Sequence, residues 1–271
     1  MYSERLSNMD ISTKNNETHS RPESVRELEI NAGAADFTGR WRPGAILEAM
    51  QDSATAHSED LGAGRARMLD NGVLWILSRT HLQMQEYPML YERARIRTWP
   101  GAPNRFFFPR CFVIERPDGR RLGSAAQLWL LLDMNTRTVI PPSKARLRFP
   151  DTSSMPLPLP APDRVRRLES GRAFATERPV AYTDLDVNGH VNNARYADWI
   201  CDLLPLETLR GHCVENLLLN YVKEARPGPP VRCSLTLEGR RFSLLGESEG
   251  GEQVIFEAGG TLSPWRSDRR V

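Results

Sequence analysis

An internal repeat is the feature of this 271-residue sequence that most constrains its fold. The string Asp36-Phe-Thr-Gly-Arg40 precedes the string Asp186-Val-Asn-Gly-His190 by 150 positions, with the aspartates and the glycines in register. In both halves a predicted helix and then a run of predicted strands follow the string. A repeat of this kind indicates one structural unit used twice. We therefore expect an α+β protein made of two tandem units of roughly one hundred residues, each a helix wrapped by an antiparallel β-sheet.

The first unit begins with its helix. From Pro43 to Leu61 the apolar residues recur at spacings of three, four and seven, which is typical of a helix with one buried face. The strands predicted after it cover residues 72–79, 92–99, 106–115 and 122–133. The second of these alternates strictly and places Arg93, Arg95 and Arg97 on one face, which predicts a half-exposed strand.

A proline-rich segment separates the two units. Prolines at positions 150, 156, 158, 160 and 162 predict an extended linker, which we assign to residues 151–170. The N-terminal unit is then 25–150 and the C-terminal unit 171–265. In the second unit we expect a helix with Tyr196 and Trp199 inward and strands near 216–224, 231–238, 240–246 and 252–258. Residues 1–24 are polar and aperiodic, which predicts a disordered tail, and residues 266–271 form a second tail.

The overall composition sets limits on function. A formal charge of +2 and a pI near 8.4 do not demand a nucleic acid or a membrane surface as partner. The four cysteines form no Cys-x-x-Cys pair, so neither a zinc site nor a dense disulfide framework is expected. There is no apolar run of about 18 residues and no secretory signal pattern, so we expect a cytoplasmic protein without a membrane span.

The second copy of the repeated string carries groups suited to catalysis. Asp186, Asn188 and His190 alternate by two, so in an extended segment their side chains would project to one side. A helix is predicted directly afterwards, with Asn192 or Asn193 as its N-cap. Free backbone N–H groups and the positive end of the helix dipole would then point to the same place. Such a place can stabilise a carbonyl oxygen that becomes negative during a reaction.

The stretch from Tyr182 to Tyr196 resembles the signature of the acyl-acyl carrier protein (acyl-ACP) thioesterases, which has the form Asp-x-Asn-x-His-Val-Asn-Asn. That family also has a functional glutamate on a strand about 34 residues after the histidine, and Glu224 stands there. The resemblance extends over about residues 25 to 260. It implies a double hot-dog fold and hydrolysis of fatty acyl-ACP, with the acyl carrier protein as partner and with no metal or cofactor.

One departure from the family narrows the mechanism. Plant members commonly carry a cysteine directly after the glutamate, whereas this chain has Ala225, and neither Cys201 nor Cys213 falls at a motif position. Attack by water or by a carboxylate is left. We assign Glu224 as general base, Asn188 as an amide that holds water or carbonyl, and His190 as proton donor or oxyanion partner. Asp186 either orients this network or attacks directly, and both roles stay open.

The first half differs from the second at the positions that matter. Asp36 keeps the carboxylate, but Thr38 replaces Asn188 and Arg40 replaces His190. We infer one catalytic site per chain, in the C-terminal half, with the N-terminal half binding the acyl chain. The resemblance implies an acyl pocket there, with Met50, Ala54 and Trp75 as its candidates, although apolar residues at such spacing are usually ordinary core.

Several alternatives stay open at this point. The arginines at 93, 95, 97, 164, 166 and 167 would suit an acidic carrier protein or would simply meet water. The repeated string could be a polar turn that precedes a helix. The substrate could be acyl-coenzyme A, or the protein could bind acyl groups or the carrier without catalysis. A hot-dog dehydratase fits the string less well. Assembly as a homo-oligomer is also open.

Overall fold

The computed structural model describes residues 21–145, 147 and 149–265. Of the predicted tails, residues 1–20 and 266–271 lie outside the described residues. The prediction of disorder is wrong for the end of the first tail, because Glu23 pairs with Arg97 and Ser24 begins a strand. The N-terminal half contains β1 (Ser24–Glu29), α1 (Pro43–Asp60), α2 (Arg65–Asp70), β2 (Val73–Met84), β3 (Arg93–Pro100), β4 (Phe108–Glu115), β5 (Arg121–Asp133) and β6 (Val139–Ile140). The C-terminal half contains β7 (Arg172–Arg178), α3 (Arg195–Leu203), α4 (Leu206–Gly211), β8 (His212–Tyr221), β9 (Val231–Glu238), β10 (Arg241–Glu247) and β11 (Val254–Pro264).

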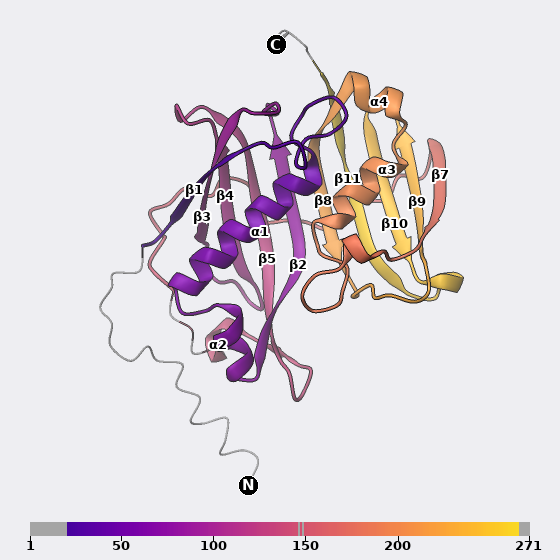
Figure 1. The fold of residues 1–271 in the computed structure, drawn as a ribbon. Coiled ribbons are helices and arrows are strands. Elements are labelled where there is room, and N and C mark those ends of the chain that lie inside the picture. The colour runs from indigo at the N-terminus through magenta and orange to yellow at the C-terminus, as the bar shows by residue number, and fades with distance from the viewer. Residues whose placement is uncertain (1–20, 146, 148, 266–271) are drawn as a thin grey trace.

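The two halves share one antiparallel sheet. Its strand order is β1-β3-β4-β5-β2-β8-β11-β10-β9-β7, with β6 beside β5. The order in the second half reverses that in the first. The strands that follow the two helix pairs, β2 and β8, therefore meet in the middle of the sheet, with Thr80 opposite Leu219. The helices α1 and α3 lie across one face of this sheet (Figure 1). The predicted duplication and the α+β arrangement are confirmed.

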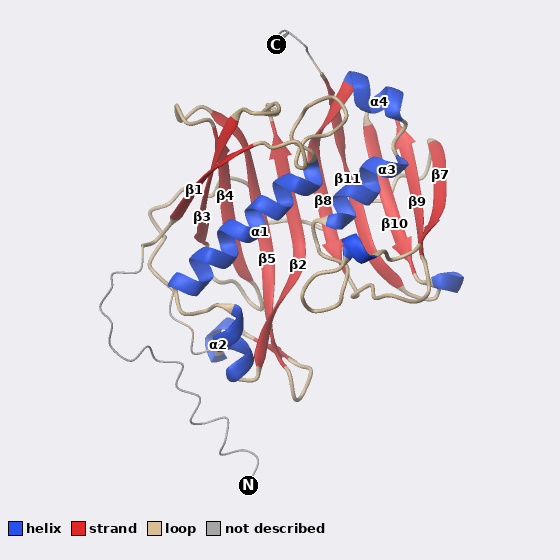
Figure 2. Cartoon of the chain, in the orientation of Figure 1, coloured by secondary structure: helices blue, strands red, loops and turns tan. Residues whose placement is uncertain are grey.

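The helices form where the apolar periodicity predicts them. On α1, Ile46, Leu47 and Met50 are buried against the sheet. On α3, Tyr196 and Trp199 are buried, as expected, but the helix is half the length of α1. One hydrophobic core runs through both halves beneath the two helices. A second, smaller cluster includes Met68 of α2, the short helix drawn below α1 in Figure 2.

The linker packs against the second half of the sheet. Residues 151–170 contain no helix or strand. The backbone N–H of Leu168 donates to Ser243 Oγ on β10 (2.9 Å), and Arg167 pairs with Glu257 on β11 (2.8 Å). Of the linker arginines considered for carrier binding, Arg167 therefore already has a carboxylate partner.

The arginines of β3 meet glutamates from a neighbouring strand that the sequence patterns did not reveal. Strand β1 pairs with β3 along its whole length. Glutamates of β1 and the residue before it meet the three arginines: Arg93 and Arg95 with Glu27, and Arg97 with Glu23. The face is therefore a row of ion pairs with little surplus positive charge, which weakens its interpretation as a docking surface for an acidic carrier.

Within the described residues, no helix is both long and apolar enough to cross a membrane.

Candidate active site

The segment from Asp186 to His190 is a closed turn, and the prediction of an extended segment is wrong. Leu185 and Val191 form a β-bridge, and the Asp186 N–H donates to the His190 carbonyl (2.8 Å). Gly189 has φ +73°, a conformation that glycine adopts without steric cost. Asp-x-Asn-Gly is a sequence typical of turns. The aspartate side-chain oxygen accepts from the backbone N–H two residues later, in place of a backbone carbonyl. The turn brings the polar groups together by folding back instead of by strand alternation.

Asp186 is the internal brace of this turn. Its Oδ1 accepts from the backbone N–H groups of Asn188 (2.8 Å) and His190 (3.3 Å). Its Oδ2 accepts from the Asn188 amide Nδ2 (3.2 Å). Both carboxylate oxygens are therefore engaged in fixing the positions of the two neighbouring side chains.

Glu224 meets His190 although 34 positions separate them. Nε2 of His190 lies 3.4 Å from Oε2 of Glu224, which also accepts from Arg226 (3.0 Å). The resemblance implied a strand position for Glu224, and this is wrong. Glu224 lies in the loop after β8, which ends at Tyr221. The His190 side chain is 20% exposed and that of Glu224 is 42% exposed, so solvent reaches the pair.

Backbone contacts hold the two segments together. The Val191 N–H donates to the Ala225 carbonyl (2.9 Å), one residue beyond the His190–Glu224 pair on each side. The hydroxyl of Tyr196 on α3 meets the backbone of Ala225, and burial raises the pKa of that hydroxyl, so it stays protonated. The geometry of the pair is thus set by the fold and not by two mobile side chains.

Asn188 also contacts the other half of the chain. Its Oδ1 accepts from the Arg65 guanidinium (2.9 Å) at the start of α2. Arg65 and Arg226 are exposed, as is Lys223, the residue before Glu224. The sequence patterns did not single out Arg65, because 123 positions separate it from Asn188 and it belongs to no motif.

The helix after the turn starts later than predicted. Its N-cap is Ala194 and its first residue Arg195, so neither Asn192 nor Asn193 is the cap residue. Asn192 nevertheless satisfies one free donor, because its Oδ1 accepts from the Ala194 N–H (2.9 Å). The N–H of Asn192 donates to the Asp184 carbonyl, whereas no described residue accepts from the N–H of Asn193. Asn193 therefore keeps a backbone donor for a ligand.

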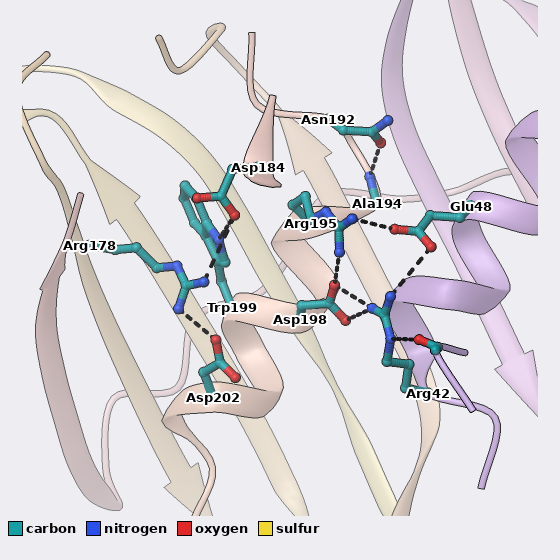
Figure 3. A network of polar contacts seen from close by, with 11 residues as sticks. Arg42, Glu48, Arg178, Asp184, Asn192, Ala194, Arg195, Asp198, Trp199 and Asp202 are labelled. Atoms are coloured by element: carbon teal, nitrogen blue, oxygen red, sulfur yellow. Dashed lines mark hydrogen bonds and ion pairs between the residues drawn. The ribbon is translucent and has the colours of Figure 1, made fainter. Parts of the chain in front are cut away.

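A polar network fixes α3 against α1. Arg42, the N-cap of α1, donates to both oxygens of Asp198 on α3 (2.6 and 2.5 Å). Arg195 bridges Asp198 (3.0 Å) and Glu48 on α1 (3.0 Å), as Figure 3 shows. Since Arg195 is the first residue of α3, these ion pairs hold the start of the helix close to α1. The position of the catalytic turn, which ends five residues earlier at His190, is therefore coupled to the N-terminal half.

Asp184 turns away from the site. Its buried carboxylate accepts from Trp199 Nε1 (3.2 Å) and from the Ala181 N–H (2.8 Å), with Arg178 3.9 Å away (Figure 3). It braces the loop against α3 and does not face His190.

The three residues predicted for an acyl pocket do not form one group. Met50 and Ala54 are buried in the main core under α1. Trp75 belongs to the second cluster, where it contacts the Phe108 ring edge-on at 5.0 Å and donates from Nε1 to the Ala63 carbonyl. The half-buried Trp75 stands near α2, and α2 contacts the catalytic turn through Arg65.

The described residues offer neither a cysteine nucleophile nor a metal cluster. Burial raises the pKa of the Cys201 thiol to about 12 and also raises that of Cys213, so neither is a ready thiolate. No group of three or more histidine, cysteine or carboxylate side chains among these residues is arranged to hold a metal ion.

Comparison with known proteins places this geometry in context. Two family models match: the acyl-ACP thioesterase N-terminal domain over residues 23–143 and the acyl-ACP thioesterase C-terminal domain over residues 169–254. An oleoyl-acyl carrier protein thioesterase from Arabidopsis thaliana is 24% identical over 247 residues, which is 83% of this chain and 63% of that protein. A dodecanoyl-[acyl-carrier-protein] hydrolase from Umbellularia californica is 22% identical, over 78% of this chain and 60% of that protein. The chain thus spans somewhat over half the length of these curated relatives.

Solved structures agree on the fold. An acyl-ACP thioesterase from Bacteroides thetaiotaomicron superposes with a TM-score of 0.77 at 24% identity, over 92% of this chain and all of that one. The 12:0-ACP thioesterase from Umbellularia californica gives 0.77 at 21% identity, over 90% of this chain and 98% of that one. The expected double hot-dog fold is confirmed.

Proposed function

The chain belongs to the acyl-ACP thioesterase family, and on that premise we propose that it hydrolyses fatty acyl-ACP to the free acid and the carrier thiol. The observation that carries the proposal is the His190–Glu224 pair, 3.4 Å apart and open to solvent beside the Asp186 turn. The names of the curated relatives, which act on oleoyl and dodecanoyl thioesters of the carrier, support the choice of substrate.

In the proposed reaction, Glu224 takes a proton from a water molecule, and the resulting hydroxide attacks the thioester carbonyl carbon. A thioester needs no stronger nucleophile, because its thiolate leaves easily. The C–S bond then breaks, and the thiolate receives a proton from His190 or from the protonated Glu224. The products are a carboxylic acid and a free thiol, so atoms and charges balance without a cofactor.

The side-chain amide of Asn188 and the backbone N–H of Asn193 are the proposed donors to the carbonyl oxygen of the thioester. Asn188 is held between Asp186 and Arg65, and the N–H of Asn193 at the start of α3 has no described acceptor. Donors fixed in advance at such a place are worth on the order of 3 kcal/mol each in the transition state.

Asp186 is a positioning residue in this mechanism. Both of its oxygens already accept hydrogen bonds from the turn that contains Asn188 and His190. Direct attack would require one of these oxygens to give up its contacts within the turn. Of the two roles that the sequence left open, orientation therefore has the better support.

The carrier is the finer part of the proposal. Arg226 pairs with Glu224 and Arg65 contacts Asn188, both exposed, and positive charge there suits the phosphate of a pantetheine arm. Since acyl-ACP and acyl-coenzyme A share that arm, the choice between them rests on the family. A cytoplasmic location is likewise part of the proposal.

The test is a comparison of acyl-ACP with acyl-coenzyme A at equal chain length, measured as free acid released. We expect kcat/KM at least tenfold higher with the carrier thioester. A higher value with coenzyme A would replace the carrier by coenzyme A in this proposal. Binding of acyl-ACP without release of acid would identify a non-catalytic acyl-binding protein instead.

A further inference from the structure

Three polar side chains cross the sheet of the N-terminal half beneath α1. Arg110 on β4 stands opposite Gln127 on β5, and Gln127 stands opposite Thr80 on β2. Directly opposed residues of antiparallel strands point to the same face. That face is the one covered by α1, because Arg110 contacts His57 on this helix. All three side chains are more than nine-tenths buried, and we call them the polar row.

The polar row separates the two apolar clusters of the protein. Two residues further along the strands on one side lie Phe112, Ala125 and Leu82 of the main core. On the other side lie Phe108 and Trp129 of the second cluster. Burying polar groups between two apolar regions costs free energy unless each group finds a partner.

Arg110 carries a buried positive charge that no described carboxylate pairs. Its Nε donates to Thr98 Oγ1 (2.8 Å) and its Nη2 to His57 Nδ1 (2.8 Å), while no described residue accepts from Nη1. Since Nδ1 accepts, His57 is neutral and donates from Nε2 to the Arg21 carbonyl (3.0 Å). Burial lowers the pKa of Arg110 to about 10, so the guanidinium is still charged at neutral pH.

Gln127 also has unused hydrogen-bonding capacity, and Thr80 lies at the end of the row. Gln127 Oε1 accepts from Trp129 Nε1 (3.1 Å), but no described residue accepts from its Nε2. Thr80 Oγ1 is fully buried, and the described polar group beside it is the Tyr221 hydroxyl. Arg110 Nη1 and Gln127 Nε2 thus keep free donor capacity in a row that is more than nine-tenths buried, which suits an acceptor that is not part of the chain.

The polar row lies within reach of the catalytic turn. The hydroxyl of Tyr221, which donates to the Asn193 carbonyl (3.1 Å), lies beside Thr80 at one end of the row. On α2, Arg65 contacts Asn188, and Met68 packs into the second cluster. An acyl chain held at His190 that extends under α2 would rest on this cluster, with the polar row along its edge.

We propose that the polar row binds an oxygen group on the acyl chain, so that the substrate is an oxygenated acyl thioester and not a plain hydrocarbon one. This rests on the proposed function, because it concerns the acyl group of the same reaction. The free donors of Arg110 and Gln127 suit an acceptor oxygen, and the unpaired charge favours a carboxylate over a ketone. A plain alkyl chain would leave these donors unmatched, and sites built to hydrogen-bond a substrate strongly reject analogues without the group.

The test uses acyl-ACP substrates of one chain length, either unsubstituted, with an ω-carboxyl group or with a ketone. For the wild type, kcat/KM should be at least tenfold higher with an oxygenated chain. In Arg110→Met this preference should vanish, mainly through a higher KM, while the rate on the unsubstituted chain changes less than threefold. The control is Arg97→Met, the same exchange on the next strand, where the arginine is over one-third exposed and paired with Glu23.

A binding measurement separates this proposal from the proposed function. The free dicarboxylic acid should raise the melting temperature of the wild type and of Glu224→Gln, but not that of Arg110→Met. Gln127→Met, which should weaken the same binding, serves if Arg110→Met does not fold. Binding of the diacid without any thioester hydrolysis would overturn the proposed function but support the proposed binding role of the polar row. Hydrolysis at equal rates on plain and oxygenated chains, together with no diacid binding, would overturn the proposed binding role of the polar row.

Discussion

The turns at Asp36 and Asp186 are two copies of one device put to different uses. In each, the aspartate N–H donates to the carbonyl four residues later, and the glycine has positive φ, +82° at Gly39 and +73° at Gly189. In each, the aspartate Oδ1 accepts from the N–H groups two and four residues later. The backbone of the turn is therefore independent of the chemistry that it presents.

The side chains make the difference. Where His190 faces Glu224, Arg40 is buried and donates to the carbonyls of Leu209 and His212 in the other half. The partner segment has changed as well. Trp41 N–H donates to the Pro88 carbonyl as Val191 N–H donates to that of Ala225, which places Tyr87 where Glu224 stands.

Tyr87 is also used to join the halves. It is buried, and its hydroxyl donates to the Val214 carbonyl on β8 (2.6 Å). The first copy of the site has thus become a clamp between the halves, while the second has kept its side chains open to solvent. Duplication thus let one copy specialise in stability and the other in chemistry.

The largest effect is expected when the catalytic residues beside the second turn are replaced. Glu224→Gln removes the proposed base but keeps the shape of the side chain, and His190→Ala removes its partner. Each should lower kcat at least 100-fold, because general base catalysis is worth 100-fold or more. The melting temperature should stay within about 2 °C of wild type, since both groups are partly exposed. Near-normal turnover in either purified variant would remove that residue from the mechanism.

The mirror experiment disables the first copy. Arg40→Met leaves the Leu209 and His212 carbonyls without their donor and removes the ion pair with Asp36. Because these groups are buried, we expect a loss of about 3 kcal/mol in the free energy of unfolding, measured by urea titration. Arg93→Met, at an arginine that is 62% exposed, should cost less than 1 kcal/mol. If Arg40→Met were as stable as that control, the clamp would carry no stability.

A smaller change tests the second member of the clamp. Tyr87→Phe removes only the hydroxyl and leaves the buried Val214 carbonyl unsatisfied. The expected cost is about 1–2 kcal/mol in unfolding free energy, with kcat unchanged. A fall in kcat without a loss of stability would show that the first copy contributes to the chemistry after all.

The sequence predicted what local patterns encode. The periodicity from Pro43 to Leu61 predicted α1, and the repeated strings at Asp36 and Asp186 predicted the duplication. Both signals lie in short stretches of consecutive residues. The motif also singled out the His190–Glu224 pair, through its resemblance to a family. The roles of those residues stay predictions until variants are measured.

What the sequence did not reveal depends on contacts between distant segments. Arg65 meets Asn188 only because α2 of one half packs beside the turn of the other, and nothing near Arg65 signals that. Strand β1 escaped notice because half of its residues are charged, and their partners, on β3 and α1, are distant in sequence. The extended form expected for Asp186 to His190 failed because the Asn-Gly turn chemistry outweighed the alternation of polar residues.

The smallest effect separates shape from chemistry at the glycines of the two turns. Alanine at positive φ costs about 1–2 kcal/mol, so Gly39→Ala and Gly189→Ala should lose similar stability. A Cβ at Gly189 meets nothing within 4 Å, and one at Gly39 meets only the tip of Met89 at 3.4 Å, so crowding does not distinguish them. Only Gly189→Ala should lower kcat, by a few-fold, because it shifts Asn188 and His190. Asparagine tolerates this conformation, so Gly189→Asn should restore most of the rate. Equal losses of kcat in both alanine variants would mean that the two turns are coupled through the sheet, and the division between clamp and catalyst would have to be redrawn.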